Sequence, residues 1–495
     1  MAENASQQIQ TIRLPTVLPL LLTLLPLLVF HSRTMPKQFF DSLSAPAFWI
    51  AIAHSFFWGS VWLAGPKSIN ACETIQDADL KRFTSEIDKL TARKAPVDDE
   101  SLDAWYKANT SRQNTAAWTK LHQELQRPAV IKLSKKLDEV LKVQPNLREG
   151  GVEYLTLARE LVRECRDNLD TIYRLCVDAK PIQAPLQFES YDTLLPHLEA
   201  MQWVSLMLDA EFAVAMADDN AKGRARVIAT QFRLGSVMQN QPGFVGELIR
   251  IRCRSRAFEN LQWALEANVL SNLDAKNLLN LLLQQPRSID AWKNAVATER
   301  AFGLVACANP KYLEILYPDL KNFKMVATFK DRLNYLQLMS DAENIDVQSP
   351  DKFLSELKRI EDHISAKTKL RDKDWIFTGM LLPSFNAGAI PAIKDAIMHR
   401  QAELALRIRM HQQEKGGFPI SLNALQENQS ATPSITLPGD KDFGYKVLGR
   451  TAILWGPTTL KSNSFVAVVP RHTLKTADES KKDPDAAWSI FLLSE

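Results

Sequence analysis

The sequence predicts a mainly α-helical protein with membrane-spanning segments at its amino terminus and a small antiparallel β-sheet at its carboxyl end. Two uncharged apolar stretches begin the chain, helical patterns with short breaks follow to about residue 415, and short strand-like runs come last. Glycine is scarce, with 17 in 495 residues. This disfavours nucleotide-binding α/β folds, which place glycines at tight turns against phosphate. A chain of this length predicts two or three domains.

The first expected domain, residues 1–66, is a membrane anchor. Residues 14–30 and 45–65 contain no Lys, Arg, Asp or Glu. The second stretch is long enough to cross a bilayer as a helix. Its tryptophans suit the interface between lipid and water: Trp49, Trp58 and Trp62. The first stretch is nearly long enough and carries three prolines, which spanning helices tolerate as kinks. We therefore expect one or two transmembrane helices.

Two interpretations of the anchor stay open. In one, both stretches span the membrane as a hairpin with Arg33 and Lys37 in its loop. In the other, Met35 is the true start and one signal anchor follows a short basic leader. The positive-inside rule places Arg33 and Lys37 in the cytoplasm. Both interpretations therefore predict a bacterial inner-membrane protein with residues 67–495 outside the cytoplasm.

The second expected domain, residues 67–389, is a body of helices joined by short turns. Residues 244–267 predict one helix with four apolar residues on one face: Ile251, Phe258, Leu261 and Leu265. Ser271–Asp274 is a capping box that begins the next helix. Helix pairs of this size resemble tetratricopeptide-type stacking, without a strict repeat period. Such a stack leaves an outer face for a protein partner, whereas a plain bundle has none; both remain open.

Four arginines alternate along residues 244–267, at positions 250, 252, 254 and 256. Steps of two residues turn about 200° on a helix, so Arg250, Arg252, Arg254 and Arg256 divide between opposing faces. They form no single basic stripe, and the net charge of the chain is only +3. We interpret these arginines as solvated and expect no nucleic-acid partner.

The five cysteines are interpreted as small buried apolar residues rather than redox or metal sites. Cys165 and Cys176 lie in a stretch with the pattern of one helix. Eleven helical residues would separate them by roughly 16 Å, too far for a disulfide.

The sequence identifies no catalytic, cofactor-binding or metal-binding residue. It contains no phosphate-binding glycine loop, no H-E-x-x-H zinc pattern and no G-x-S-x-G nucleophile turn. His399 and His411 share one expected helix, but about 18 Å would separate them along it, too far to bind one metal ion. The acidic run at 478–485 is interrupted by Lys481 and Lys482, which disfavours calcium. We expect no cofactor, and enzymatic activity is left open.

The third expected domain, residues 390–495, joins a long helix to a small sheet. Residues 390–415 predict a helix with an apolar stripe, and Gly416 would end it in the left-handed conformation. Ser421 would cap a short helix. Strand-like runs follow at 443–448, 451–455, 465–469 and 488–493. The first two would join as a tight hairpin across residues 448–451.

A long helix, then Gly-x-Phe-Pro-x-Ser-Leu-x-x-Leu at 416–425, then a small sheet resembles the carboxy-terminal part of type II secretion pseudopilins. More closely, the chain resembles a family of uncharacterised membrane-anchored helical proteins from planctomycete and verrucomicrobial bacteria. The segments that carry this resemblance are 114–118, 194–225, 241–251, 297–301 and 414–425. The resemblance implies an amino-terminal membrane segment, a helical body and this ending, and it brings no known activity.

These observations favour a membrane-anchored, extracytoplasmic helical scaffold or protein-interaction module. An accessory component of a secretion or pilus-like machine is one alternative. An enzyme with an unrecognised site in the helical body is another. The expected partners are membrane lipid, through the amino-terminal segments, and a protein on the helical body.

Overall fold

A computed structural model describes residues 76–143, 151–286, 288–309, 327–346, 350–370, 372–382, 385–425, 436–437, 441–456 and 490–494. Internal contacts divide the chain into two units, Met1–Lys67 and Ser68–Glu495. The apolar stretches at 14–30 and 45–65 lie outside the described residues, as does Met35. Within the part of the chain that is described, no helix has the length and apolar character needed to cross a membrane.

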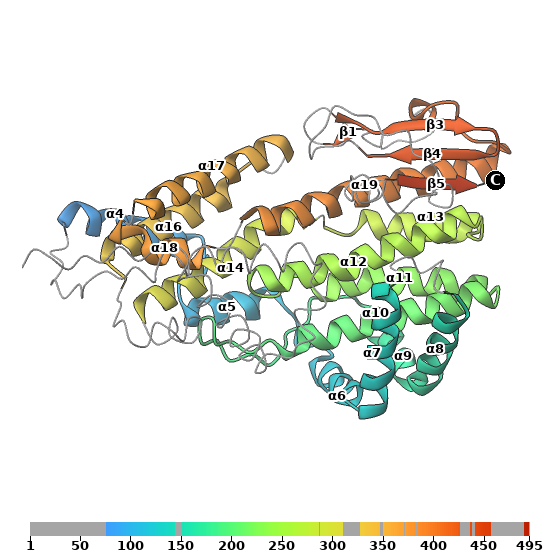
Figure 1. Cartoon of the computed structure of the whole chain (residues 1–495), viewed down its shortest axis with the longest axis horizontal. Coiled ribbons are helices and arrows are strands. Elements are labelled where there is room, and N and C mark those ends of the chain that lie inside the picture. Colours follow the sequence, from blue (N-terminus) through green and yellow to red (C-terminus); the bar gives the residue numbers. More distant parts are fainter. Residues whose placement is uncertain are drawn as a thin grey trace, which may run out of the picture. The chain divides into compact units, whose positions relative to one another are not determined.

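The described part of the second unit is mainly helical, as the sequence predicts (Figure 1). Its first helices are α4 (Asp77–Ala92), α5 (Asp99–Asn109), α6 (Thr115–Leu125), α7 (Pro128–Val143), α8 (Gly151–Glu164), α9 (Arg166–Leu175), α10 (Pro196–Ala217) and α11 (Ala221–Val237). Then follow α12 (Gly243–Glu266), α13 (Asn272–Leu283), α14 (Ser288–Ala308), α16 (Phe329–Asn344), α17 (Pro350–Lys369), α18 (Ile376–Leu381) and α19 (Phe385–Lys415). Two 3₁₀ turns, η4 (Lys373–Trp375) and η5 (Leu422–Leu425), complete the set.

Short polar side chains begin several of these helices, because they satisfy backbone N–H groups that have no partner inside the helix. The Ser271 side chain accepts a hydrogen bond from the Asp274 backbone N–H at 3.1 Å, as expected for this cap. Thr328 does the same for Asp331 at the start of α16. Local sequence therefore sets where these helices begin.

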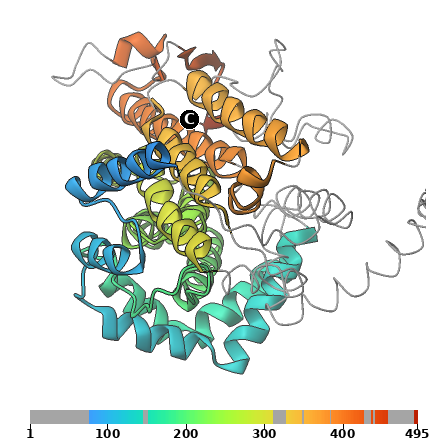
Figure 2. The same cartoon turned by 90° about the vertical axis from the view of Figure 1, so that its left-hand side faces the viewer.

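Two long helices, α12 and α19, lie at the centre of the unit. Helix α12 packs against α10, α11, α14 and α19, and α19 packs against α13, α14 and α17. Figure 2 shows the first described helices, α4 and α5, beside the later helices α16 and α14, which they contact. Because α12 and α19 have neighbours on several sides, they are buried on more than the single apolar stripe expected for each.

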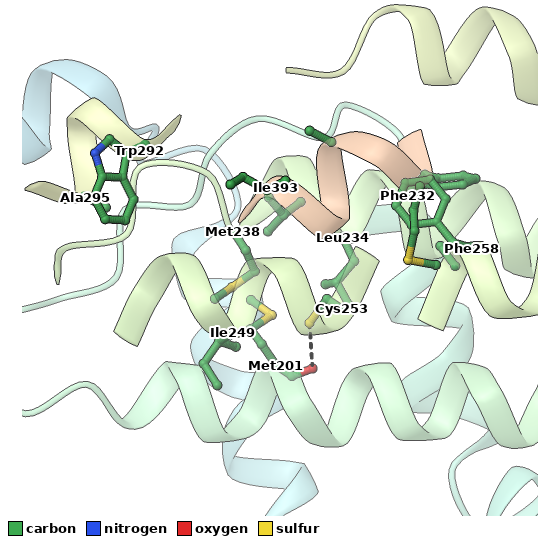
Figure 3. Packing of buried hydrophobic residues seen from close by; sticks show 14 of the residues in the cluster. Met201, Phe232, Leu234, Met238, Ile249, Cys253, Phe258, Trp292, Ala295 and Ile393 are labelled. Atoms are coloured by element: carbon green, nitrogen blue, oxygen red, sulfur yellow. Dashed lines mark hydrogen bonds between the residues drawn. The ribbon is translucent and has the colours of Figure 1, made fainter. Parts of the chain in front are cut away.

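The hydrophobic core lies between these central helices and their neighbours (Figure 3). Phe232 of α11 meets Phe258 of α12 edge-on, with ring centroids 5.2 Å apart. The Cys253 thiol lies 3.9 Å from the Met201 carbonyl oxygen of α10, and Ile393 of α19 belongs to the same cluster. Sulfur and aromatic side chains thus fill the space between α10, α11 and α12.

The four described cysteines are buried and unbridged: Cys165, Cys176, Cys253 and Cys307. Cys72 lies outside the described residues. The expectation of one helix through Cys165 and Cys176 is wrong. The chain breaks at Cys165, whose backbone has φ −106° and ψ 21°, so α8 and α9 are separate helices. Neither glycine nor proline marks this break, so local sequence gave no signal of it.

The carboxyl end forms the expected small antiparallel sheet. Strands β3 (Gly444–Leu448), β4 (Thr451–Trp455) and β5 (Ile490–Ser494) pair in the order β3-β4-β5. The hairpin at 448–451 is confirmed, since Leu448 pairs with Thr451. A separate short pair, β1 (Thr436–Leu437) with β2 (Lys441–Asp442), was not expected. The expected strand at 465–469 lies outside the described residues.

The junction between α19 and the sheet has the expected form. Gly416 has φ +76°, the left-handed conformation that commonly ends a helix and that glycine adopts without steric cost. The short turn η5 follows, and the Tyr445 hydroxyl of β3 donates to the Pro419 carbonyl oxygen at 3.0 Å. Strands β4 and β5 pack on α19, and the Gln401 side-chain amide donates to the Leu454 carbonyl oxygen at 3.3 Å. The sheet is thereby attached to the central helix.

Candidate functional site

The arginines of α12 lie inside the protein, and their interpretation as solvated is wrong. Arg250 and Arg254 are 0% exposed, and the Arg256 side chain is 18% exposed. Their expected division between opposing faces is present, because Arg254 pairs toward α19 and Arg256 pairs toward α10. Helical periodicity separated the faces correctly. It could not show that both faces are covered by helices that carry carboxylates.

Arg254 is the centre of a cluster that joins α12 to α19. Its Nε donates to Asp395 Oδ1 at 3.0 Å, and its Nη2 lies 2.7 Å from Nδ1 of His399. A guanidinium can only donate, so His399 Nδ1 accepts and its proton resides on Nε2. Arg254 Nη1 also donates to the Pro286 carbonyl oxygen at 2.9 Å. Because Asp395 and His399 are four residues apart on α19, one helix face presents both to the same arginine.

The helix backbone must approach closely for Arg254 to fit. A Cβ atom at Gly235 of α11 would lie 2.6 Å from Arg254 Cγ. Burial is the largest influence on the Arg254 guanidinium and lowers its pKa, while the Asp395 carboxylate acts in the opposite direction. One turn earlier, Arg250 makes two bonds to Glu247, at 2.7 and 2.8 Å. We call Glu247, Arg250, Arg254, Asp395 and His399 the α12–α19 cluster.

A second buried cluster lies on the opposite side of α12. Asp209 of α10 is 0% exposed and pairs with Arg256. Its Oδ1 also accepts from the Gln231 side chain at 2.7 Å and from the Asn260 side chain at 3.0 Å. Burial raises the pKa of Asp209, and Arg256 opposes that effect. This α10–α12 cluster of Asp209, Gln231, Arg256 and Asn260 connects three helices through one carboxylate.

A third cluster connects the first described helix to the body. Glu343 of α16 pairs with Arg300 of α14, which is 0% exposed. The same carboxylate accepts from Arg93, at the end of α4, at 2.7 Å. The rings of Phe83 in α4 and Phe329 in α16 are 5.3 Å apart. One glutamate therefore holds α4, α14 and α16 together.

The chemistry of these clusters is that of fixed ion pairs. Each carboxylate already accepts hydrogen bonds from a guanidinium, so removing one partner leaves an unpaired charge in the interior. Buried polar groups of this kind can specify one arrangement of helices. Among the described side chains, no three His, Cys, Asp or Glu residues gather as a metal-binding group.

A surface groove of about 280 Å³ lies between α7 and α8. Lys132, Lys136 and Arg163 line it, beside Glu160 and Glu164. Ala129 and Leu133 give it a small apolar part. The groove offers charged side chains on two neighbouring helices that a solvent-borne partner could contact.

Sequence reasoning missed the buried clusters, although one signal was present. Asp209 lies within the apolar run 204–217 of α10, where an unpaired carboxylate would be costly. An acidic residue in such a run predicts a buried partner, but not which partner. Its arginine is 47 residues away in the chain.

His399 and His411 do share α19, and His399 is bound to Arg254. The expected resemblance to the planctomycete and verrucomicrobial family stays a prediction. Comparison with known protein families, with curated proteins and with solved structures finds no match for this chain.

Proposed function

We propose that this protein is a membrane-anchored helical scaffold that binds a protein partner outside the cytoplasm. The observation that carries the proposal is the uncharged stretch at 45–65, which ends just before the compact unit Ser68–Glu495. A segment of that length and composition suits a bilayer-spanning helix. The unit that follows it would then be held at the membrane surface.

The buried clusters support a scaffold role. Ion pairs inside a protein contribute little net stability compared with apolar residues of similar volume. Separating the two charges of a buried ion pair is strongly unfavourable. Such pairs therefore raise the free energy of any arrangement in which one helix has shifted along another. The clusters on both sides of α12 would keep α10, α11 and α19 in one register. A body of fixed shape presents the same surface to every partner.

The face formed by α7 and α8 is the proposed contact region. Its groove carries Lys132, Lys136 and Arg163 around Leu133. Glu160 and Glu164 also line the groove, so its formal charge is only slightly positive. Three cations, two carboxylates and a small apolar centre suit a segment of mixed charge with one or two apolar residues and a small acidic excess.

The topology is tested by fusing reporters after Glu495. We expect alkaline phosphatase to be active there and a fluorescent protein that folds only in the cytoplasm to be dark. A chain that begins at Lys67, expressed with the same reporters, should give the opposite pattern. Phosphatase inactivity of the full-length fusion, with fluorescence of the other, would place the body in the cytoplasm and overturn the proposal.

A second candidate function is an accessory role in a secretion or pilus-like machine. It is favoured by the order of elements at the carboxyl end, where α19 ends at Gly416 and a small antiparallel sheet follows. Mild crosslinking in cells, followed by purification, separates the two candidates. Recovery of secretion-machine subunits crosslinked to β3–β5 would favour the second. Crosslinks that instead join Lys132 or Lys136 to one acidic protein would favour the first.

A further inference from the structure

Helices α4 and α16 run side by side in the same direction and begin at one end of the second unit. Near their starts, the ring centroids of Phe83 and Phe329 are 5.3 Å apart. Near their ends, Arg93 donates to Glu343 at 2.7 Å. Figure 1 shows both helices at the left, beside α18. The first described helix therefore begins at the same end of the unit as α16.

The chain between α17 and α18 lies at this same end. Asp374 of η4 accepts a hydrogen bond at 2.9 Å from the side chain of Thr328, the residue that caps the start of α16. Helix α17 packs against η4, and Leu370, which follows α17, is 77% exposed. We call three exposed residues of this segment the α17 tip: Lys369, Leu370 and Lys373.

Basic residues flank the exposed leucine of the α17 tip. Residues 367–375 contain four basic and two acidic side chains, a net charge of +2. Residues 77–82, at the start of α4, add two charges of each sign and leave this excess unchanged. The carboxylates of the segment bond within the protein, because Asp372 accepts from the Asp374 backbone N–H at 3.1 Å and Asp374 accepts from Thr328. An exposed leucine beside lysines suits an anionic bilayer, where the leucine enters the interface and the ammonium groups meet phosphates.

The opposite end of the unit also exposes an apolar side chain. Ile420, which follows the end of α19, is 94% exposed. Helices α12 and α19 run in the same direction, since Arg254 donates to Asp395 and, further along, the Gln413 side chain donates to the Leu270 carbonyl oxygen. Ile420 therefore lies beyond the end of α12.

The α17 tip lies beyond the start of α12. Helix α14 runs toward that start, because Arg254 donates to the Pro286 carbonyl oxygen and the Phe244 backbone N–H donates to Glu299. The Tyr335 hydroxyl of α16 donates to the Glu299 carbonyl oxygen, and the start of α16 lies further out. The 24 residues of α12 are about 36 Å long, and the segment 329–335 of α16 adds about 9 Å. The two ends are thus at least about 45 Å apart.

The length of the connecting chain decides which end can reach a membrane. Residues 66–76 join the uncharged stretch at 45–65 to α4. Fully extended, this connection spans at most about 40 Å. If the stretch at 45–65 crosses the bilayer, the end with the α17 tip can rest on the lipid. An upright body with Ile420 on the lipid would hold the start of α4 farther away than the connection reaches.

We propose that the α17 tip contacts the surface of an anionic phospholipid bilayer, so that the body stands on the membrane at this end. The inference rests on the proposed membrane anchor and adds the orientation of the body. Leu370 enters the interface, while Lys369 and Lys373 meet lipid phosphates. The end that carries Ile420 faces away from the membrane.

The test uses full-length Leu370→Cys protein in a Cys72→Ser background, labelled with an environment-sensitive fluorophore. The four cysteines that the structure describes are buried, so the folded protein should take up label only at position 370. The protein is reconstituted into vesicles of phosphatidylcholine and phosphatidylglycerol in equal parts, with a quencher attached to some lipids near the headgroup. We expect quenching of the label at position 370. Ile420→Cys, labelled in the same way, is the matched control and should keep its fluorescence.

Charge reversal tests whether the lysines make the contact. Lys369→Glu combined with Lys373→Glu should reduce the quenching at position 370, because both ammonium groups are replaced by carboxylates that the anionic surface repels. Lys132→Glu combined with Lys136→Glu, on α7, is the control and should leave the quenching unchanged. Vesicles of phosphatidylcholine alone should also give less quenching.

Flotation of the vesicles separates the possible failures. Protein that does not float with the lipid overturns both the anchor and this contact. Protein that floats without quenching at position 370 overturns the contact alone. Quenching at position 420 that equals or exceeds that at position 370 would overturn the orientation, and so would quenching at position 370 that charge reversal of the tip leaves unchanged.

Discussion

At the scale of single residues, charge pairing explains why arginines occupy the interior. Arg254 meets Asp395 and His399, and Arg256 meets Asp209, so each guanidinium has a carboxylate within the protein. The sequence predicted which faces of the helix these arginines occupy. It did not predict their burial, because the compensating carboxylates lie on α10 and α19, far away in the chain. The burial of these arginines therefore depends on tertiary packing and not on the local sequence of α12.

Asp395→Asn should lower the free energy of unfolding by about 3–5 kcal/mol, because it removes the carboxylate that is hydrogen-bonded to the buried Arg254 guanidinium. Chemical denaturation followed by circular dichroism measures the effect. Asp218→Asn is the matched control, since its partner Arg159 is about half exposed. Breaking that surface pair should cost about 0–1 kcal/mol. Equal losses in the two variants would show that Arg254 and Asp395 are not a buried pair.

His122 and His197, each with a buried ring nitrogen, predict a loss of stability in acid. The folded-state pKa values of His122 and His197 are about 4, below the ordinary value of 6.5. The unfolded chain therefore binds protons first, and stability falls as the pH drops from about 6.5 toward 4. Burial raises the pKa of Asp331 to about 6, which acts in the opposite direction over part of this range.

The contribution of His197 is isolated by comparing the free energies of unfolding of the unsubstituted protein and His197→Gln, measured by chemical denaturation between pH 7.5 and 4.5. Over this pH range the free energy of unfolding of the unsubstituted protein should fall by up to about 3 kcal/mol more than that of the variant, since each pKa unit corresponds to about 1.4 kcal/mol. Parallel curves for the two proteins would contradict the burial of a neutral His197.

At the scale of helices and strands, the sequence correctly predicted the features that depend on residues close together in the chain. The cap at Ser271, the end of α19 at Gly416 and the β3–β4 hairpin are all present where expected. The break at Cys165 was missed because no turn-forming residue marks it. The single apolar stripes expected for α12 and α19 were incomplete, because a central helix is covered by neighbours that its own sequence does not reveal.

The close packing of α11 on α12 requires glycine at position 235. A Cβ there would lie 2.6 Å from Arg254 Cγ, and that side chain is held at its far end by Asp395. Gly235→Ala should therefore destabilise the protein by about 1–3 kcal/mol, the usual range for overpacking. Gly417→Ala is the control, because nothing lies within 4 Å of its added Cβ. Denaturation midpoints that shift equally would contradict the close approach.

Helix α4 should be the described helix most easily released by one substitution. It buries Leu90, and Arg93 at its end is held by Glu343. Arg93→Ala should speed amide hydrogen exchange throughout α4 and leave exchange in α12 unchanged. Arg82→Ala, which removes an exposed side chain of the same helix, should have little effect. Unchanged exchange in the Arg93 variant would show that Glu343 does not secure α4.

At the scale of the whole molecule, the predicted class of a mainly helical protein with a small carboxyl-terminal sheet is confirmed for the residues that the structure describes. The anchor stays a prediction based on the uncharged stretches at 14–30 and 45–65. The proposed function depends on both the helical body and the predicted anchor. A rigid helical body can serve as a surface-held scaffold only if those stretches fix it to the outer side of the membrane.

Protease digestion of spheroplasts tests the membrane anchorage and orientation of the body most directly. One tag lies beside Lys37, which both interpretations of the anchor place in the cytoplasm, and a second tag follows Glu495. If the body is anchored outside the cytoplasm, external protease destroys it while a short membrane-embedded fragment, ending near Lys67, survives. A cytoplasmic marker protein must remain intact as the control. Protection of the whole chain until the membrane is dissolved, or its recovery in the soluble fraction without detergent, would contradict the account.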